Sequence, residues 1–120
     1  MKIYKCNKCG NIVIGLKDNT PSCCGEEMKL LVANETDGAV EKHVPVVTVS
    51  DNKVEVVCGE VPHPMEEKHY IEFLLIETTK GFQIHYLNPG EEAKTTFVLE
   101  NEELVCAYAY CNLHGLWKSK

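Results

Sequence analysis

The sequence has no apolar run approaching the roughly 18 residues needed to cross a bilayer, so no membrane partner is expected. Its first residues, MKIYKCNKCG, lack the apolar core of a signal peptide, and we therefore expect a protein that is not secreted. Low-complexity tracts, internal repeats and long segments with the apolar period of a helix are also missing. What remains is an ordinary globular composition over 120 residues, which suits one domain or a domain with a small companion.

Net positive charge is lacking as well, because the formal net charge is −6 at pH 7. Residues 37–120 carry seven lysines against fourteen acidic residues, a balance of −7, whereas residues 1–36 carry five lysines against four acidic residues. The phosphates of nucleic acids require net positive contacts. The charge therefore predicts no nucleic-acid partner.

Cysteine, by contrast, is plentiful: there are seven, and Cys23 and Cys24 are adjacent. In a chain without an export signal, thiols at this density indicate metal binding or redox chemistry rather than a framework of disulfides. We therefore expect the protein to work in a reducing cytoplasm.

The composition divides the chain into two predicted domains, residues 1–36 and 37–120. The first has one short apolar run, Ile12–Leu16, between two cysteine pairs, and so small a module needs a staple such as a metal. A polar stretch, VANETDGAVEKH, resembles a linker. Beyond it, turn sequences such as TTKG and LNPGEE separate six runs that are rich in β-forming residues. The runs are VPVVTVS, KVEVVCG, HYIEFLLIET, GFQIHYL, KTTFVLE and LVCAYAY. Six or seven short strands with frequent turns predict an antiparallel β-sandwich or barrel.

The cysteines of the first domain form a Cys6-x-x-Cys9 turn followed by the Cys23–Cys24 pair. Two such pairs can fill a tetrahedral shell of four sulfurs, which suits zinc or iron. Neighbouring side chains tend to point apart, so Cys23 and Cys24 can bind one ion only if the backbone bends between them. A purely structural zinc site is the alternative.

A second, dispersed group of metal-ligand residues lies in the segments EKHVP, VPHPMEEKHY and CNLHG, each of which begins or ends a predicted strand. Loops held by a rigid sheet commonly carry function. Prolines at 45, 62 and 64 stiffen the backbone near two of the histidines. The candidate ligands are His43, His63, His69, Cys111 and His114.

Other residues of the same types are predicted to be structural. His85 alternates with apolar residues on a strand and lies in none of these segments. Cys58 and Cys106 lie in apolar strand sequence, which is typical of buried cysteines that pack as small hydrophobic residues. Trp117 is expected to pack near the CNLHG loop.

These motifs closely resemble those of the desulfoferrodoxins, the two-iron class of superoxide reductase. The resemblance runs through YKCNKCGNIV, CCGEEMK, TDGAVEKHVPV, VPHPMEEKHYIE and YCNLHGLWK, and so covers essentially the whole chain. It implies a mainly β fold, in which a small rubredoxin- or desulforedoxin-like module precedes an immunoglobulin-like β-sandwich. It also implies iron at two mononuclear sites. The first iron would be bound by Cys6, Cys9, Cys23 and Cys24, and the second by His43, His63, His69 and His114 with Cys111 as the axial thiolate.

The resemblance further implies the one-electron reduction of superoxide to hydrogen peroxide without release of oxygen. Five ligands leave a sixth position open to a small oxidant, and a thiolate pushes electron density through the metal. Glu41 and Lys42 match the family's mobile active-site pair, and Glu41 could become a sixth ligand of oxidised iron. We expect Lys42, Lys68 and Lys118 to form a local positive patch that attracts superoxide. A rubredoxin-like electron donor and a homodimer are also implied.

Three other hypotheses stay open on the sequence alone. A non-catalytic iron electron carrier would not consume superoxide. A zinc-ribbon-like binding module would hold zinc at both sites, although the acidic charge disfavours it. An oxygenase with two histidines and one carboxylate, formed by His63, His69 and Glu41, would leave Cys111 without a role.

Overall fold

The structure is a computed structural model that describes residues 1–119. The chain divides into two compact units, Met1–Val32 and Ala33–Lys120. The sequence suggests a boundary after residue 36, whereas the structure divides the chain after Val32, at the start of the same polar stretch. Within residues 1–119, no helix has the length and apolar character that crossing a membrane requires.

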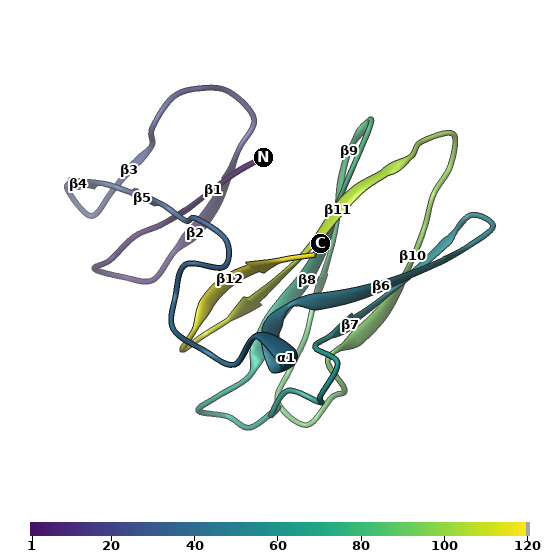
Figure 1. Ribbon diagram of the computed structural model, residues 1–120. Coiled ribbons are helices and arrows are strands. Elements are labelled where there is room, and N and C mark those ends of the chain that lie inside the picture. The colour runs from purple at the N-terminus through teal and green to yellow at the C-terminus, as the bar shows by residue number, and fades with distance from the viewer. Residues whose placement is uncertain (120) are drawn as a thin grey trace. The chain divides into compact units, whose positions relative to one another are not determined.

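The first unit consists of short strands. They are β1 (Lys2–Lys5), β2 (Ile12–Gly15), β3 (Ser22–Cys23), β4 (Glu26–Glu27) and β5 (Lys29–Leu30). β1 lies between β2 and β5 in one antiparallel sheet, and β3 and β4 form a separate hairpin (Figure 1). One buried cluster of the unit holds Tyr4, Cys6 and Met28, with Val13 and Cys23 packed against it. A core this small stabilises a fold weakly, so a bound metal would add to the stability of the unit.

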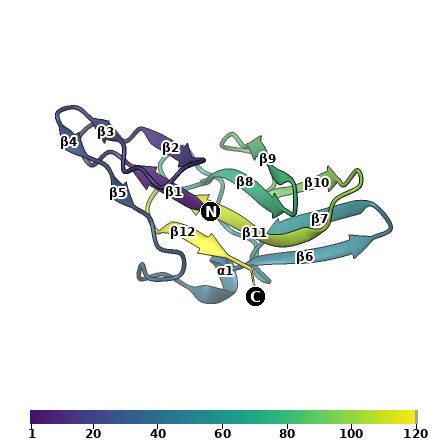
Figure 2. The same ribbon diagram turned by 90° about the horizontal axis from the view of Figure 1, so that it is seen from above.

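Residues 33–119 form a β-sandwich of a three-stranded sheet, β10-β7-β6, and a four-stranded sheet, β12-β11-β8-β9 (Figures 1 and 2). Every neighbouring pair is antiparallel. Three strands against four is the count of an immunoglobulin-like sandwich, so the predicted fold class is confirmed. The strands are β6 (Pro45–Ser50), β7 (Lys53–Cys58), β8 (Ile71–Thr78), β9 (Gly81–Tyr86), β10 (Lys94–Val98), β11 (Leu104–Cys111) and β12 (Gly115–Lys118).

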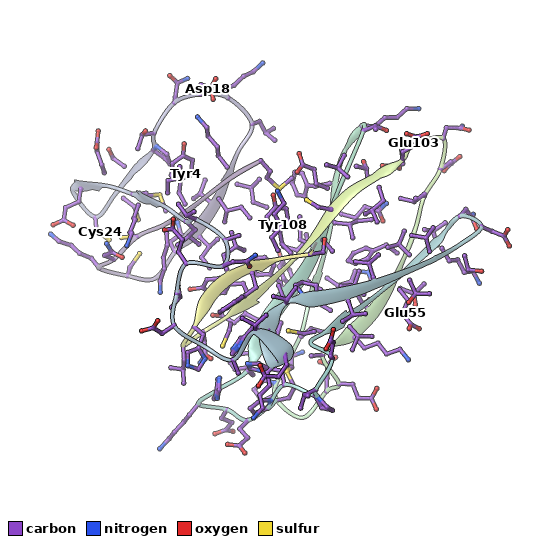
Figure 3. The ribbon with its side chains drawn as sticks, viewed as in Figure 1. Tyr4, Asp18, Cys24, Glu55, Glu103 and Tyr108 are labelled. Atoms are coloured by element: carbon purple, nitrogen blue, oxygen red, sulfur yellow. The ribbon has the colours of Figure 1, made fainter. Side chains whose placement is uncertain are left out.

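The core lies between the two sheets and follows the alternation of the strands. On β7, Val54, Val56 and Cys58 are fully buried. Glu55 between them faces outward, and its carboxylate is 3.5 Å from the Lys94 ammonium (Figure 3). β8 is buried along most of its length, and it lies between β11 and β9 in its sheet. The six predicted runs correspond to β6 through β11, while β12 was not expected.

The antiparallel topology brings five strand ends to one end of the sandwich. Pro45, the first residue of β6, pairs with Cys58, the last residue of β7. Cys111, the last residue of β11, pairs with the first residues of β8 and β12, which are Ile71 and Gly115. The short helix α1 (Val40–His43) immediately precedes β6 at this end. All three segments that contain the dispersed metal-ligand residues therefore meet there.

Candidate metal centres

The four-cysteine group consists of Cys6, Cys9, Cys23 and Cys24, whose thiol sulfurs lie within 4.8 Å of one another. The Sγ atom of Cys23 is 3.6 Å from that of Cys9 and 3.9 Å from that of Cys24. Four sulfurs bound about 2.3 Å from one tetrahedral ion would stand about 3.8 Å apart. Sulfur atoms gather beside Cys24 in Figure 3. Their measured separations fit a single metal.

A tight turn allows the adjacent Cys23 and Cys24 to reach the same site. Cys23 pairs with Glu26 at the end of the β3–β4 hairpin, and Cys24 and Gly25 form its two-residue turn. Their φ angles are 53° and 78°, and positive φ at both central residues characterises a type I′ hairpin turn. The bend that the sequence requires between the two cysteines is thus present.

The thiols of this group differ in acidity. Backbone N–H groups, foremost that of Cys9, lower the pKa of Cys6 to about 6. Hydrogen bonds with the other thiols, foremost that of Cys9, raise the pKa of Cys24 to about 12. Four thiolates this close repel one another unless a cation lies among them, and metal binding releases the remaining thiol protons. The donor set therefore fits a soft or borderline metal ion such as iron.

The histidine–cysteine group lies at the end of the sandwich where the strand ends meet. Its five donor atoms are within 4.8 Å of one another, and they belong to His43, His63, His69, Cys111 and His114. The four imidazoles form a closed circuit in which successive ring centroids are 4.6, 4.7, 5.0 and 4.8 Å apart. Each ring lies edge-on to the next, with interplanar angles between 68° and 81°.

Hydrogen bonds fix which nitrogen of two of these rings is free to bind a metal. Nδ1 of His43 is 2.7 Å from the Ala39 carbonyl oxygen, and Nδ1 of His63 is 2.6 Å from that of Pro64. Because a carbonyl only accepts, each Nδ1 is the protonated nitrogen and each Nε2 has a free lone pair. These two Nε2 atoms are 3.0 Å apart, about the separation of two nitrogen ligands at right angles on one ion.

The electrostatics also favour neutral imidazoles. Burial lowers the pKa of His43, and it lowers the pKa of His63 to about 4. Burial and the charge of the neighbouring His114 lower the pKa of His69. Neutral imidazole is the form that binds metal, so these rings do not have to lose a proton at pH 7.

The thiol of Cys111 completes the group. Its Sγ atom is 3.5 Å from Nε2 of His63 and 3.7 Å from Nδ1 of His114. Burial raises its pKa, while the backbone N–H groups of His114 and Leu113 lower it. Those two N–H groups would stabilise the thiolate once a metal has displaced the proton.

One buried nitrogen of this group lacks a hydrogen-bond partner among the described residues. Nε2 of His69 is buried, and within residues 1–119 it has no hydrogen-bond partner. A buried polar atom without a partner costs free energy, and a metal ion at the centre of the circuit would satisfy it. The residues therefore fit the predicted iron.

Glu41 and Lys42 lie on α1 immediately before His43, with exposed side chains. Besides burial and His114, the positive charge of Lys42 lowers the pKa of His69. The negative charge of Glu41 acts on His43 in the opposite direction, against the larger effect of burial. Both side chains are thus close enough to influence the imidazoles electrostatically.

The other two lysines predicted for the positive patch differ from each other. Lys68 precedes His69 and is exposed. The ammonium of Lys118 instead lies 5.9 Å from the ring centroid of Tyr108. Lys118 pairs with Tyr108 at the opposite end of β12 from the Cys111–Gly115 pair. The prediction that Lys118 belongs to the patch is therefore wrong, because β12 carries its side chain away from the site.

The residues predicted to be structural lie outside both groups. Cys58 and Cys106 are buried, and His85 packs against Phe97 and hydrogen-bonds the Thr95 hydroxyl. Trp117 is buried beside the histidine–cysteine group, as expected.

Several residues that contact the ligand segments were not predicted from the sequence. The Cys58 thiol donates to the carbonyl oxygens of Lys42 and His43, each at 3.4 Å. Gly59 and Asn112 also touch ligand segments. Asn112 lies inside the CNLHG motif, and its position next to Cys111 could have marked it as a residue of the site. The role of Gly59 depends on contacts that no local sequence pattern reveals.

Comparison with known proteins gives a consistent result. The sequence model of the family described as Desulfoferrodoxin matches residues 35–120. A desulfoferrodoxin homolog from Archaeoglobus fulgidus is 46% identical over 121 residues, which cover 99% of this chain and 96% of the relative. A desulfoferrodoxin from Nitratidesulfovibrio vulgaris is 44% identical over 121 residues, covering 99% and 95%. Among solved structures, the superoxide reductase from Treponema pallidum superposes with a TM-score of 0.83 at 31% identity, covering 100% of both chains.

The four-cysteine group and the histidine–cysteine group match the two iron sites of these proteins. Because the family model matches residues 35–120 and the Archaeoglobus fulgidus relative is similar over nearly the whole chain, the chain belongs to the desulfoferrodoxin family.

Proposed function

We propose that this protein is a superoxide reductase. It transfers one electron to superoxide and, with two protons from solvent, yields hydrogen peroxide without releasing oxygen. The observation that carries the proposal is the closed circuit of four imidazoles whose nitrogens converge with one buried thiol. The likeness to the Treponema pallidum superoxide reductase over both full chains supports the same reaction.

When bound at the histidine–cysteine group, iron supplies the electron for this reaction. Burial favours the neutral form of His43 and His63 and outweighs the opposite effect of their carbonyl hydrogen bonds on the pKa. Those bonds place the proton on Nδ1 and leave Nε2 free for the metal. The Leu113 and His114 N–H groups would stabilise the Cys111 thiolate once a metal has displaced its proton. In our proposal, Cys111, the four histidines and the four cysteines of the first unit are the iron ligands.

Lys42 and Glu41 are the proposed catalytic residues. Because superoxide is an anion and residues 37–120 carry a net −7, an exposed ammonium near His69 would raise the local concentration of substrate. Lys42 would also support protonation of the product through water. Glu41, one residue earlier, would supply a carboxylate oxygen to oxidised iron.

The source of the electrons is proposed from family membership alone. A rubredoxin-like iron protein would reduce this one, and two copies of the chain would form the working homodimer. The four-cysteine iron would either pass electrons on or stabilise the first unit. The cytoplasmic location stays a prediction.

Superoxide consumption, measured together with product yield, tests the reaction. The reduced iron-loaded protein should form one hydrogen peroxide per superoxide consumed and no oxygen, whereas a dismutase would form half as much peroxide and release oxygen. Cys111→Ser should abolish the reaction, because the electron donation of the thiolate is lost. Cys106→Ser, a matched change of a buried cysteine outside both groups, should leave it unchanged.

Each alternative gives a different result in the same experiment. A non-catalytic electron carrier would leave superoxide at its uncatalysed rate of decay. A zinc-binding module would show zinc at both sites in metal analysis. Wild-type turnover by Cys111→Ser would remove Cys111 from the proposed ligand set, whereas an oxygenase formed by His63, His69 and Glu41 would consume oxygen instead of superoxide.

A further inference from the structure

Asn112 joins the strand end that carries Cys111 to the loop that carries His69. Its side-chain Oδ1 accepts a hydrogen bond from the Tyr70 N–H at 3.0 Å, and its Nδ2 donates to the Lys68 carbonyl at 3.0 Å. Its backbone N–H also donates to the Tyr70 carbonyl at 3.2 Å. The amide thus binds the backbone on both sides of His69.

The strand ladder alone does not fix this loop. β11 and β8 pair regularly from Cys106 with Glu77 to Tyr110 with Phe73, but the register shifts before the final pair of Cys111 with Ile71. Such an irregularity bends the strand and disrupts the ladder locally. The bonds from Asn112 continue the connection beyond it, across a sequence separation of 42 to 44 residues.

His69 depends on its backbone more than the other ligands do. His43 and His63 are each held through Nδ1 by a carbonyl, and His114 contacts the Cys111 thiol. In the part of the chain that the structure describes, the buried Nε2 of His69 has no hydrogen-bond partner. Its donor atom is therefore aimed by the loop from Glu66 to Tyr70, which is closed by two 3.0 Å bonds between Glu66 and His69.

We propose that Asn112 is a positioning residue for His69, which it places relative to Cys111 so that both donors meet one metal ion. A hydrogen-bonded partner usually orients a ligating histidine through its ring, and here the side-chain amide does so through the backbone. The inference rests on the proposed ligand set and does not depend on superoxide as the substrate.

A double-mutant cycle on the full chain tests the proposal. The dissociation constant of ferrous iron at the histidine–cysteine group is measured by competition with a chelator, and the absorption of the ferric four-cysteine centre serves as an internal control. Asn112→Ala should weaken iron binding about tenfold, the size typical of losing such a supporting contact. In a His69→Ala background the same change should have less than a twofold effect, because the residue it positions is gone. The absorption bands of the oxidised histidine–cysteine centre should also shift in Asn112→Ala alone.

Asn34 provides a matched control. Its side chain also makes two bonds to backbone, accepting from the Lys118 N–H at 2.9 Å and approaching the Lys118 carbonyl at 3.5 Å, but neither flanks a proposed ligand. Because its φ is 65°, Asn34→Gly removes the bonds without backbone strain. Iron affinity and the absorption bands should stay at wild-type values in this variant.

Three results would overturn the proposal: unchanged affinity in Asn112→Ala, an equal loss in the His69→Ala background, or an equal loss in Asn34→Gly. If Asn112→Ala does not fold, the same cycle with Asn112→Asp tests the proposal. The carboxylate can still accept from the Tyr70 N–H, but it cannot donate to the Lys68 carbonyl. Any direct effect of the introduced carboxylate charge on iron affinity would be the same with and without His69, so it would cancel when the two backgrounds are compared. If His69→Ala itself leaves affinity unchanged, the proposed ligand set is wrong. If the cycle holds but superoxide is not consumed, only the proposed reaction is wrong.

Discussion

The indole ring of Trp117 stacks on the imidazole of His43, with ring centroids 4.9 Å apart and an interplanar angle of 24°. Its Nε1–H donates to the His114 carbonyl oxygen at 3.0 Å. Trp117 thus supports the ring of one proposed ligand and the backbone of another. Gly38 completes this contact, because a Cβ there would come within 3.2 Å of the indole and 3.3 Å of the imidazole.

The emission of Trp117 should report on the metal. The chain has one tryptophan, and iron at the histidine–cysteine group would deactivate its excited state through the stacked imidazole. Loading with iron should therefore quench the fluorescence severalfold relative to the metal-free protein. Zinc, which has no redox chemistry, should leave most of the emission. Equal emission with the two metals would mean that Trp117 does not stack on a ligand.

Cys24→Ser should separate the two iron sites. The variant removes one sulfur from the four-cysteine group, and serine is a poor ligand for soft metals. We expect loss of the visible absorption of the four-cysteine centre, while the histidine–cysteine group retains its iron and its reaction with superoxide, since the two groups share no residue. Metal analysis and absorption spectra check both sites. Loss of both irons would contradict independent folding of the two units.

Gly59 lies against the segment that carries Lys42. A Cβ at position 59 would come within 2.6 Å of the Lys42 carbonyl carbon and oxygen and within 2.7 Å of the Glu41 backbone carbonyl oxygen. The φ of Gly59 is 83°. Gly59→Ala should therefore lower the free energy of unfolding by more than the roughly 1–3 kcal/mol of backbone strain alone. It should also slow the reaction with superoxide by displacing Lys42.

Gly90→Ala is the control for this change. Gly90 has a φ of 91°, but among residues 1–119 no atom beyond its two chain neighbours lies within 4 Å of a Cβ built there. Its substitution therefore adds backbone strain without a clash. Chemical denaturation and stopped-flow rates compare the two variants. Equal losses of stability, with no change in rate, would show that Gly59 contributes only its backbone conformation.

Local patterns in the sequence predict most of the fold. Strands β6 to β11 were predicted correctly because alternating apolar residues indicate which face of a strand is buried and turn sequences indicate where a strand ends. β12 was missed because four residues after a ligand motif show no clear alternation. The residues of both metal groups were found because their segments are specific in type and spacing.

The supporting contacts could not be predicted in the same way. The bonds of Asn112 and the packing of Gly59 against Lys42 join segments far apart in the sequence, and a strand register decides which residues meet. Lys118 illustrates the same limit. It follows His114 closely in sequence, but the direction of β12 takes it to Tyr108.

The roles of Lys42 and Glu41 should separate in the kinetics. Lys42→Ala should slow the second-order reaction of the reduced protein with superoxide up to about tenfold, because it removes the ammonium that attracts the anion. The wild-type rate should fall with added salt, since ions screen this attraction, and the rate of Lys42→Ala should depend less on salt. Stopped-flow mixing at two ionic strengths measures all of these rates.

Two variants complete this experiment. Lys118→Ala makes the same change of charge at a lysine that lies over Tyr108, so its rate should stay near the wild-type value if position matters more than net charge. Glu41→Ala should leave the encounter rate nearly unchanged and alter the spectrum of the oxidised iron, because a carboxylate oxygen prefers the harder ferric ion. If Lys42→Ala reacts as fast as the wild type, or Lys118→Ala slows as much as Lys42→Ala, then Lys42 does not guide superoxide to the site.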